Sequence, residues 1–236
     1  MSRAKSFLFV ALPLATVLIV AALPGCSSNS SSPQARVEKP ISMPASQPEP
    51  ASAPLPKLPP PTQAEVKAAF HRVFGDDLVA QTNSGRVAFI AGDFNGDQSE
   101  DIAILARPAA GKLDDINSEF ANWIIQDADK AFITPPGKAV VVPPRQEPPK
   151  VSQGEEVLAI IHGYGAAGWR NPDARQAYLV KHAAAPFMGT APSLSQKAIR
   201  AMHLPYETEI IKQVRNNKKG FLFWTGSVYA WHPSEG

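Results

Sequence analysis

The feature that most constrains the fold is a long N-terminal part of the chain that cannot build a hydrophobic core. Residues 26–61 contain ten prolines and a serine-rich run over 27–32. A segment of this composition buries too little apolar surface to offset its ordering entropy, and proline favours an extended polyproline II backbone. We therefore predict a disordered linker over 26–61 and a single folded domain over 62–236, which is long enough for one domain of typical size.

The segment before the linker has the organisation of an export signal. Arg3 and Lys5 precede an uncharged apolar run over 6–22, which is shorter than a typical membrane-spanning helix. We predict that residues 1–25 are a signal peptide. The same two charges account for the net charge of +2, so the rest of the chain is balanced and lacks the basic surplus that nucleic-acid binding needs.

The end of this signal, Leu23-Pro24-Gly25-Cys26, resembles the lipobox of bacterial lipoproteins. The resemblance implies that Cys26 is acylated and becomes the N-terminus of a membrane-anchored protein of the cell envelope. Ser27 stands where an aspartate usually retains such proteins in the inner membrane, which favours the outer membrane. The alternative is a stray cysteine after an ordinary signal peptide or signal anchor. Cys26 is the one cysteine of the chain, so no intrachain disulfide can form.

The pattern of residues 62–236 predicts an α+β fold with a mainly antiparallel sheet, an N-terminal helix and one or two further helices. Thr62 and Glu65 form a capping-box pattern, and apolar residues at helical spacing follow as far as Phe74. A further helix is expected over 193–202, while residues 113–131 are open to helix or to a strand near 123–126. Thr225-Gly226 predicts a tight turn between the last two strands. The expected strands cover residues 86–91, 102–107, 138–142, 157–162, 176–182, 207–214, 220–224 and 227–232.

An Asp-rich loop between two of these strands is a candidate metal site. Side-chain oxygens alternate along it at Asp93, Asn95, Asp97 and Asp101, and the Ser99 carbonyl lies between the last two. Calcium needs about six to eight oxygen ligands, and alternate residues of a tight loop can supply several of them. The alternative is a bare β turn whose side chains cap their own backbone.

The segment from Phe89 to Leu105 resembles a single FG-GAP or VCBS-type repeat, the calcium loop of integrin alpha-chain propellers. The resemblance implies weak calcium binding through Asp93, Asn95, Asp97 and Asp101. Gln98 occupies a position where that family usually has glycine. One copy cannot make a propeller, so we expect an FG-GAP-like domain of a different architecture.

A second motif, His162-Gly163-Tyr164-Gly165, resembles the oxyanion loop of α/β-hydrolases. No nucleophile elbow follows it in the sequence, so a small envelope hydrolase is only the alternative function. We expect either a Gly-rich turn with an aromatic cover or a ligand surface formed by His162, Tyr164, Trp169 and Arg170. The aromatic residues of the C-terminal hairpin fit core packing or an exposed binding platform.

These observations predict an envelope lipoprotein with a non-enzymatic binding or structural role. The sequence shows no complete catalytic constellation. The expected partners are the membrane, through the lipid on Cys26, and an envelope protein or polysaccharide. The expected cofactor is weakly bound calcium.

Overall fold

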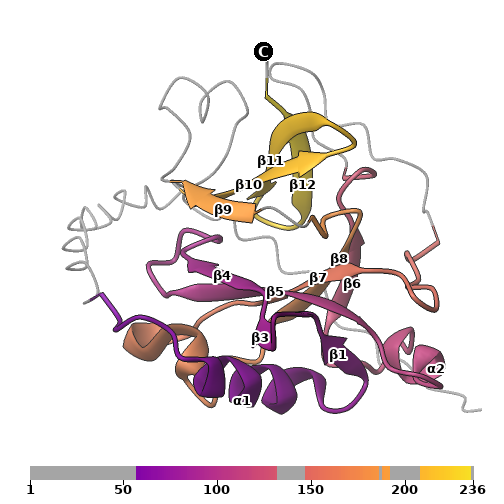
Figure 1. Cartoon of the computed structure of the whole chain (residues 1–236), viewed down its shortest axis with the longest axis horizontal. Helices are drawn as coiled ribbons and strands as arrows, with labels where there is room; N and C mark the ends of the chain where they lie inside the picture. The colour runs from indigo at the N-terminus through magenta and orange to yellow at the C-terminus, as the bar shows by residue number, and fades with distance from the viewer. Residues whose placement is uncertain (1–56, 132–146, 186–187, 192–207, 235–236) are drawn as a thin grey trace, which may run out of the picture. The chain divides into compact units, whose positions relative to one another are not determined.

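The computed structural model describes residues 57–131, 147–185, 188–191 and 208–234. It has the predicted α+β fold, in which mainly antiparallel sheets follow an early helix (Figure 1). The predicted signal peptide, Cys26, most of the linker, the strand over 138–142 and the helix over 193–202 lie outside the described residues.

The described helices are α1 (Gln63–Phe74), α2 (Leu113–Ile116) and the 3-10 helix η1 (Gly165–Arg170). The described strands are β1 (Leu78–Ala80), β2 (Thr82–Asn83), β3 (Arg86–Val87), β4 (Phe89–Gly92), β5 (Asp101–Pro108), β6 (Ile124–Asp127), β7 (Val157–Ile161), β8 (Ala177–Lys181), β9 (Met188–Ala191), β10 (Ile210–Arg215), β11 (Lys218–Trp224) and β12 (Tyr229–Pro233).

The larger sheet is built around the long strand β5. Its order is β1-β5-β7-β8-β6, and β4 lies beside β1 on the same edge of β5. β4 pairs with residues 101–104 of β5 and β1 pairs with residues 106–108. These pairs are antiparallel, as is the short β2–β3 hairpin, whereas β6 and β8 are parallel.

The smaller sheet has the antiparallel order β12-β11-β10-β9. Thr225 donates a backbone hydrogen bond to the Val228 carbonyl, so the two-residue turn of the last hairpin is Gly226-Ser227. The predicted turn, Thr225-Gly226, is one residue too early. Gly226 has φ 96°, a conformation that glycine adopts without strain.

The elements form three layers, with α1 on one face of the larger sheet and the smaller sheet on the other (Figure 1). The central strand β7 divides its side chains between the two cores. Val157, Ala159 and Ile161 pack toward α1, and Leu158 and Ile160 pack toward the smaller sheet. Because both faces of the sheet are covered at β7, every residue of this strand is apolar.

Helix α1 confirms its predicted start and buried face. The Thr62 hydroxyl accepts the Glu65 amide at 3.3 Å, and the Glu65 carboxylate accepts the Thr62 amide at 2.8 Å. The helix ends at Phe74 and is capped by Gly75, whose φ is 54°. The predicted apolar positions are all buried, namely Val66, Ala69, Phe70, Val73 and Phe74.

The ambiguous segment 113–131 contains only a single helical turn. It forms α2 at its start and strand β6 at Ile124–Asp127, close to the strand alternative. The Trp123 indole donates to the Ile116 carbonyl at 3.1 Å, and its ring lies 5.6 Å from that of Phe74. Trp123 therefore packs against α1 from the connection between α2 and β6.

Candidate functional site

The Asp-rich loop joins β4 to β5 and begins at a paired edge. Gly92 and Asp101 are register partners, so residues 93–100 form the connection of an antiparallel hairpin. The Asp93 carbonyl accepts the Glu209 amide at 2.7 Å, just before β10. The loop is thereby attached to the smaller sheet as well as the larger one.

Asp101 is the buried centre of the loop, with no exposed surface. Its Oδ2 accepts the amides of Phe94 at 2.8 Å and Asn95 at 3.2 Å, and its Oδ1 accepts the Gly163 amide at 2.7 Å. Burial raises the pKa of Asp101 well above its usual range, although the amide hydrogen bonds oppose this. One carboxylate therefore joins the loop to the turn after β7.

The other loop side chains bind amides of the loop itself. Asp93 accepts from Gly96 at 2.7 Å and from Gln98 at 2.9 Å, and Asp97 accepts from Ser99 at 2.8 Å. This is the pattern expected of a self-capping turn. A carboxylate has about four acceptor sites, so these bonds leave lone pairs that a cation can use.

Gln98 adopts the left-handed backbone conformation that glycine usually takes at this place. Its φ is 71°, and its amide is held by Asp93 at 2.9 Å. A residue with a Cβ is strained in this region by about 1–2 kcal/mol. The loop therefore keeps the backbone path of a glycine-containing loop at some energetic cost.

The Gly-rich segment after β7 packs directly on this loop. The Trp169 amide donates to the Glu100 carbonyl at 2.7 Å, and Ser99 Oγ donates to the Gly165 carbonyl at 3.1 Å. A Cβ added at Gly163 or Gly168 would lie 2.4 or 2.5 Å from the Glu100 carbonyl oxygen. Both glycines are therefore needed for the close approach of two backbone segments.

His162 is a buried connection between the two sheets. Its side chain is 1% exposed, its Nε2 lies 2.7 Å from the Tyr229 hydroxyl, and its Nδ1 lies 3.3 Å from the Asn95 amide nitrogen. Because the Asn95 nitrogen can only donate, Nδ1 accepts and Nε2 carries the proton. Burial lowers the pKa of His162 to about 4, so the ring is neutral at pH 7. Tyr178 and Trp224 surround it at centroid distances of 4.8 and 5.1 Å.

The four residues of the candidate ligand surface do not share one exposed face. Trp169 and His162 are buried, and Tyr164 is 63% exposed. Arg170 binds Glu100 at 2.9 Å and the Pro59 carbonyl at 2.7 Å. The arginine thus connects the start of the domain to the loop region.

This geometry does not favour the hydrolase alternative. The Gly163 amide, which an oxyanion hole would need, donates to Asp101. His162 contacts Asn95 and Tyr229 within the protein interior.

An acidic pocket of about 340 Å³ adjoins the loop. Its charged lining residues are Asp93, Glu100, Glu209 and Lys57. Burial raises the pKa of Glu209, and the charge of Asp93 raises it further. Glu209 is not among the residues predicted from the sequence, because its approach to the loop depends on the packing of β10 and no local pattern indicates that packing.

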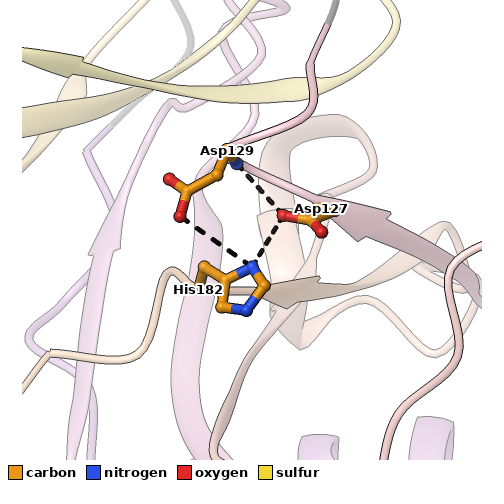
Figure 2. Close-up of side chains that lie close together, drawn as sticks. All are labelled: Asp127, Asp129 and His182. Atoms are coloured by element: carbon orange, nitrogen blue, oxygen red, sulfur yellow. Dashed lines mark hydrogen bonds and ion pairs between the residues drawn. The ribbon is translucent and has the colours of Figure 1, made fainter.

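A second group of metal-type ligands lies elsewhere, at the ends of β6 and β8. Ligand atoms of Asp127, Asp129 and His182 all lie within 4.8 Å of one another (Figure 2). His182 is not among the candidate residues predicted from the sequence. In the sequence, each of the two strands ends at or next to a residue that can bind a metal, Asp127 or His182. This pattern indicates a shared site only when the two strands are known to be parallel neighbours.

In the described part of the chain, no helix is both long and apolar enough to cross a membrane. Comparison with known proteins found no matching family model, no matching curated protein and no matching solved structure.

Proposed function

We propose that this chain is a lipid-anchored protein of the bacterial cell envelope. Its folded domain acts as a non-enzymatic binding or structural module and holds calcium in the loop between β4 and β5. The anchor rests on the sequence: the apolar signal, the lipobox-like Leu23-Pro24-Gly25-Cys26 and the Pro-rich linker. Ser27 after the cysteine supports the outer membrane as the location. An envelope protein or polysaccharide is the proposed partner.

The calcium proposal is carried by carboxylate charge that lacks a basic partner. The charges of Asp97 and Asp93 both raise the pKa of Asp101, so the three groups are close enough to repel one another. Within the described residues, the ion pairs of Lys, Arg and His involve none of these three carboxylates. A divalent cation would relieve this repulsion.

The loop offers the oxygen donors that calcium prefers. The proposed ligands are Asp93, Asn95, Asp97, the Ser99 carbonyl and Asp101. Asp101 holds the loop in place through amides on both sides, and Glu209 adds negative charge in the adjoining pocket. Calcium accepts this mixture of carboxylate, amide and carbonyl oxygens because its coordination is flexible.

Thermal melting of the full chain in detergent, with EDTA or with calcium, tests the proposal. For a dissociation constant on the order of 0.1–1 mM, as in extracellular calcium modules, about 5 mM calcium is a suitable concentration. Ligand at about ten times the dissociation constant stabilises the folded state by about 1.4 kcal/mol. The melting temperature should then rise by about 3–6 °C.

Two variants make the melting test specific to the loop. Asp97→Ala should abolish the calcium-dependent rise, whereas Asp114→Ala, an exposed aspartate in α2, should keep it. Equal melting temperatures of the wild type in EDTA and in calcium would leave the loop as a self-capping turn and refute the calcium proposal.

A further inference from the structure

We propose that Asp127, Asp129 and His182 form a binding site for a divalent transition-metal ion, with Zn²⁺ as the fitting occupant. The site is separate from the β4–β5 loop and does not depend on calcium binding there. It is formed where the parallel strands β6 and β8 end side by side.

The strand pairing fixes the positions of the three ligands. Asp127 is the last residue of β6 and pairs with Lys181, the last residue of β8, so His182 follows immediately beside it. His182 Nδ1 lies 2.7 Å from Asp127 Oδ1 and 3.9 Å from Asp129 Oδ2. Figure 2 shows the imidazole nitrogen directed at both carboxylates.

The donor set matches zinc better than calcium or magnesium. Zinc binds imidazole nitrogen and carboxylate oxygen at about 2.0–2.2 Å, so two ligands of one tetrahedral ion lie about 3.3 Å apart. The two distances from Nδ1 bracket this value, which small side-chain rotations can reach. Calcium and magnesium favour oxygen ligands, whereas imidazole suits zinc and its neighbours in the first transition row.

Neighbouring groups hold the ligands in orientation. The Asp127 side chain is only 6% exposed, and its Oδ1 also accepts the Asp129 amide at 3.1 Å. Arg215 Nη2 binds the Asp129 carboxylate oxygens at 2.7 and 2.8 Å and packs 4.7 Å from the Trp231 ring. Hydrogen bonds of this kind commonly orient metal ligands and tune affinity.

Charge alone does not hold a cation at this place. Arg215 is paired with Asp129, and Lys130 lies 3.8 Å from Asp127, so the basic groups offset the two carboxylates. Affinity must therefore come from directed bonds to the three ligand atoms.

The site is open to solvent on one side. The side chains of His182 and Asp129 are each 48% exposed and line a pocket of about 320 Å³ together with Ala184 and Val214. A zinc ion with three protein ligands usually takes water or a substrate atom as its fourth ligand. The pocket provides room for that fourth ligand.

Titration calorimetry of the untagged, metal-stripped full chain in detergent with ZnCl₂ tests the proposal. The wild type should bind zinc at one site, and His182→Gln or Asp129→Asn should weaken that site at least about tenfold. His71→Gln is the matched control because His71 forms a His–Asp pair with Asp76 at 3.5 Å. This control should bind zinc as the wild type does.

The outcomes separate this site from the calcium loop. Asp97→Ala should keep zinc binding, and His182→Gln should keep any calcium-dependent rise in melting temperature. Circular dichroism checks that the variants are folded, and Asp129→Asn changes a half-exposed side chain that the core does not depend on. Absence of zinc binding in the wild type, or equal zinc affinity in wild type and His182→Gln, would show that the trio is an ion-pair cluster only.

Discussion

His162 connects three parts of the protein through one neutral imidazole ring. It receives the Asn95 amide from the Asp-rich loop, contacts the Tyr229 hydroxyl of β12 and packs against Tyr178 of β8. Protonation would place a charge in this buried site and would remove the acceptor at Nδ1. The conformation of the loop is therefore linked to the protonation state of a single residue.

We predict that this histidine makes the protein less stable in acid. In the unfolded chain a histidine takes up its proton near pH 6.5, whereas the pKa of folded His162 is about 4. The unfolded state therefore binds more protons in this window, and stability is lost as the pH falls from about 6.5 to 4. The shift corresponds to about 3 kcal/mol.

Urea unfolding at about pH 7 and pH 4, in EDTA, checks this effect of protonation. Other groups also titrate in the window, so the comparison is with His162→Gln. The stability difference between wild type and variant should shrink by about 3 kcal/mol on acidification. Parallel pH profiles for the two proteins would contradict the prediction.

We predict that Gln98→Gly stabilises the domain without any metal. Gln98 has φ 71°, and glycine removes the Cβ strain there, although it gains entropy in the unfolded chain. The net increase should be about 0.5–1 kcal/mol. Gln98→Ala is the control, because it removes the side chain beyond Cβ and keeps the backbone strain. An equal gain in stability for both variants would show that the gain does not come from relief of that strain.

At the scale of elements, the contact between the Gly-rich segment and the Asp-rich loop is the central junction. The Glu100 carbonyl receives the Trp169 amide, and the Glu100 carboxylate receives the Trp169 indole at 2.8 Å and Arg170 at 2.9 Å. Gly163 donates to Asp101 in the same contact. Gly163 and Gly168 thus allow two loops to pack closely against each other.

We predict that Gly163→Ala destabilises the protein more than Gly165→Ala. At Gly163 a Cβ would meet the Glu100 carbonyl oxygen at 2.4 Å, whereas at Gly165 it would meet nothing within 4 Å. Gly165 has φ 61°, so its substitution carries only the conformational strain of about 1 kcal/mol. Overpacking against backbone at Gly163 should reach about 3 kcal/mol. Chemical denaturation measures the free energy of unfolding of both variants. Equal decreases would show that the contact between the two loops accommodates a Cβ at Gly163 at little cost.

Local elements could be predicted from the sequence, and long-range pairing could not. Helix α1 is encoded by the Thr62–Glu65 capping box and apolar spacing, which are properties of neighbouring residues. The parallel pairing of β6 with β8 depends on which distant strands meet, and the sequence around Ile124–Asp127 does not specify a partner. The candidate oxygen donors of the Asp-rich loop can be recognised for the same local reason, whereas Glu209 and the Asp127–His182 contact cannot.

At the scale of the whole molecule, burial explains which strands were easy to recognise. β5, β7 and β8 are covered by α1 on one face and by the smaller sheet on the other, so they are apolar almost throughout. Strand β1 has only three residues and β2 has two exposed polar residues, so both are too short to stand out in the sequence. The Pro59 carbonyl, held by Arg170, lies where the predicted linker meets this layered domain.

We predict that the whole protein is attached to the membrane through Cys26 alone. A tether over residues 26–61 can reach about 30–35 Å as a flexible coil and about 110 Å when fully extended. More than one acyl chain on Cys26 gives stable anchoring, since each buried CH₂ contributes about 0.8 kcal/mol. Intact mass should therefore show loss of residues 1–25 and a gain of acyl chains, and the protein should enter the detergent phase.

Cys26→Ala should lose both properties, whereas Ser27→Ala, which leaves the lipobox-like sequence intact, should keep them. A Cys26→Ala protein that fractionates with membranes and has the wild-type mass shift would exclude lipidation at this residue and would require a different anchor.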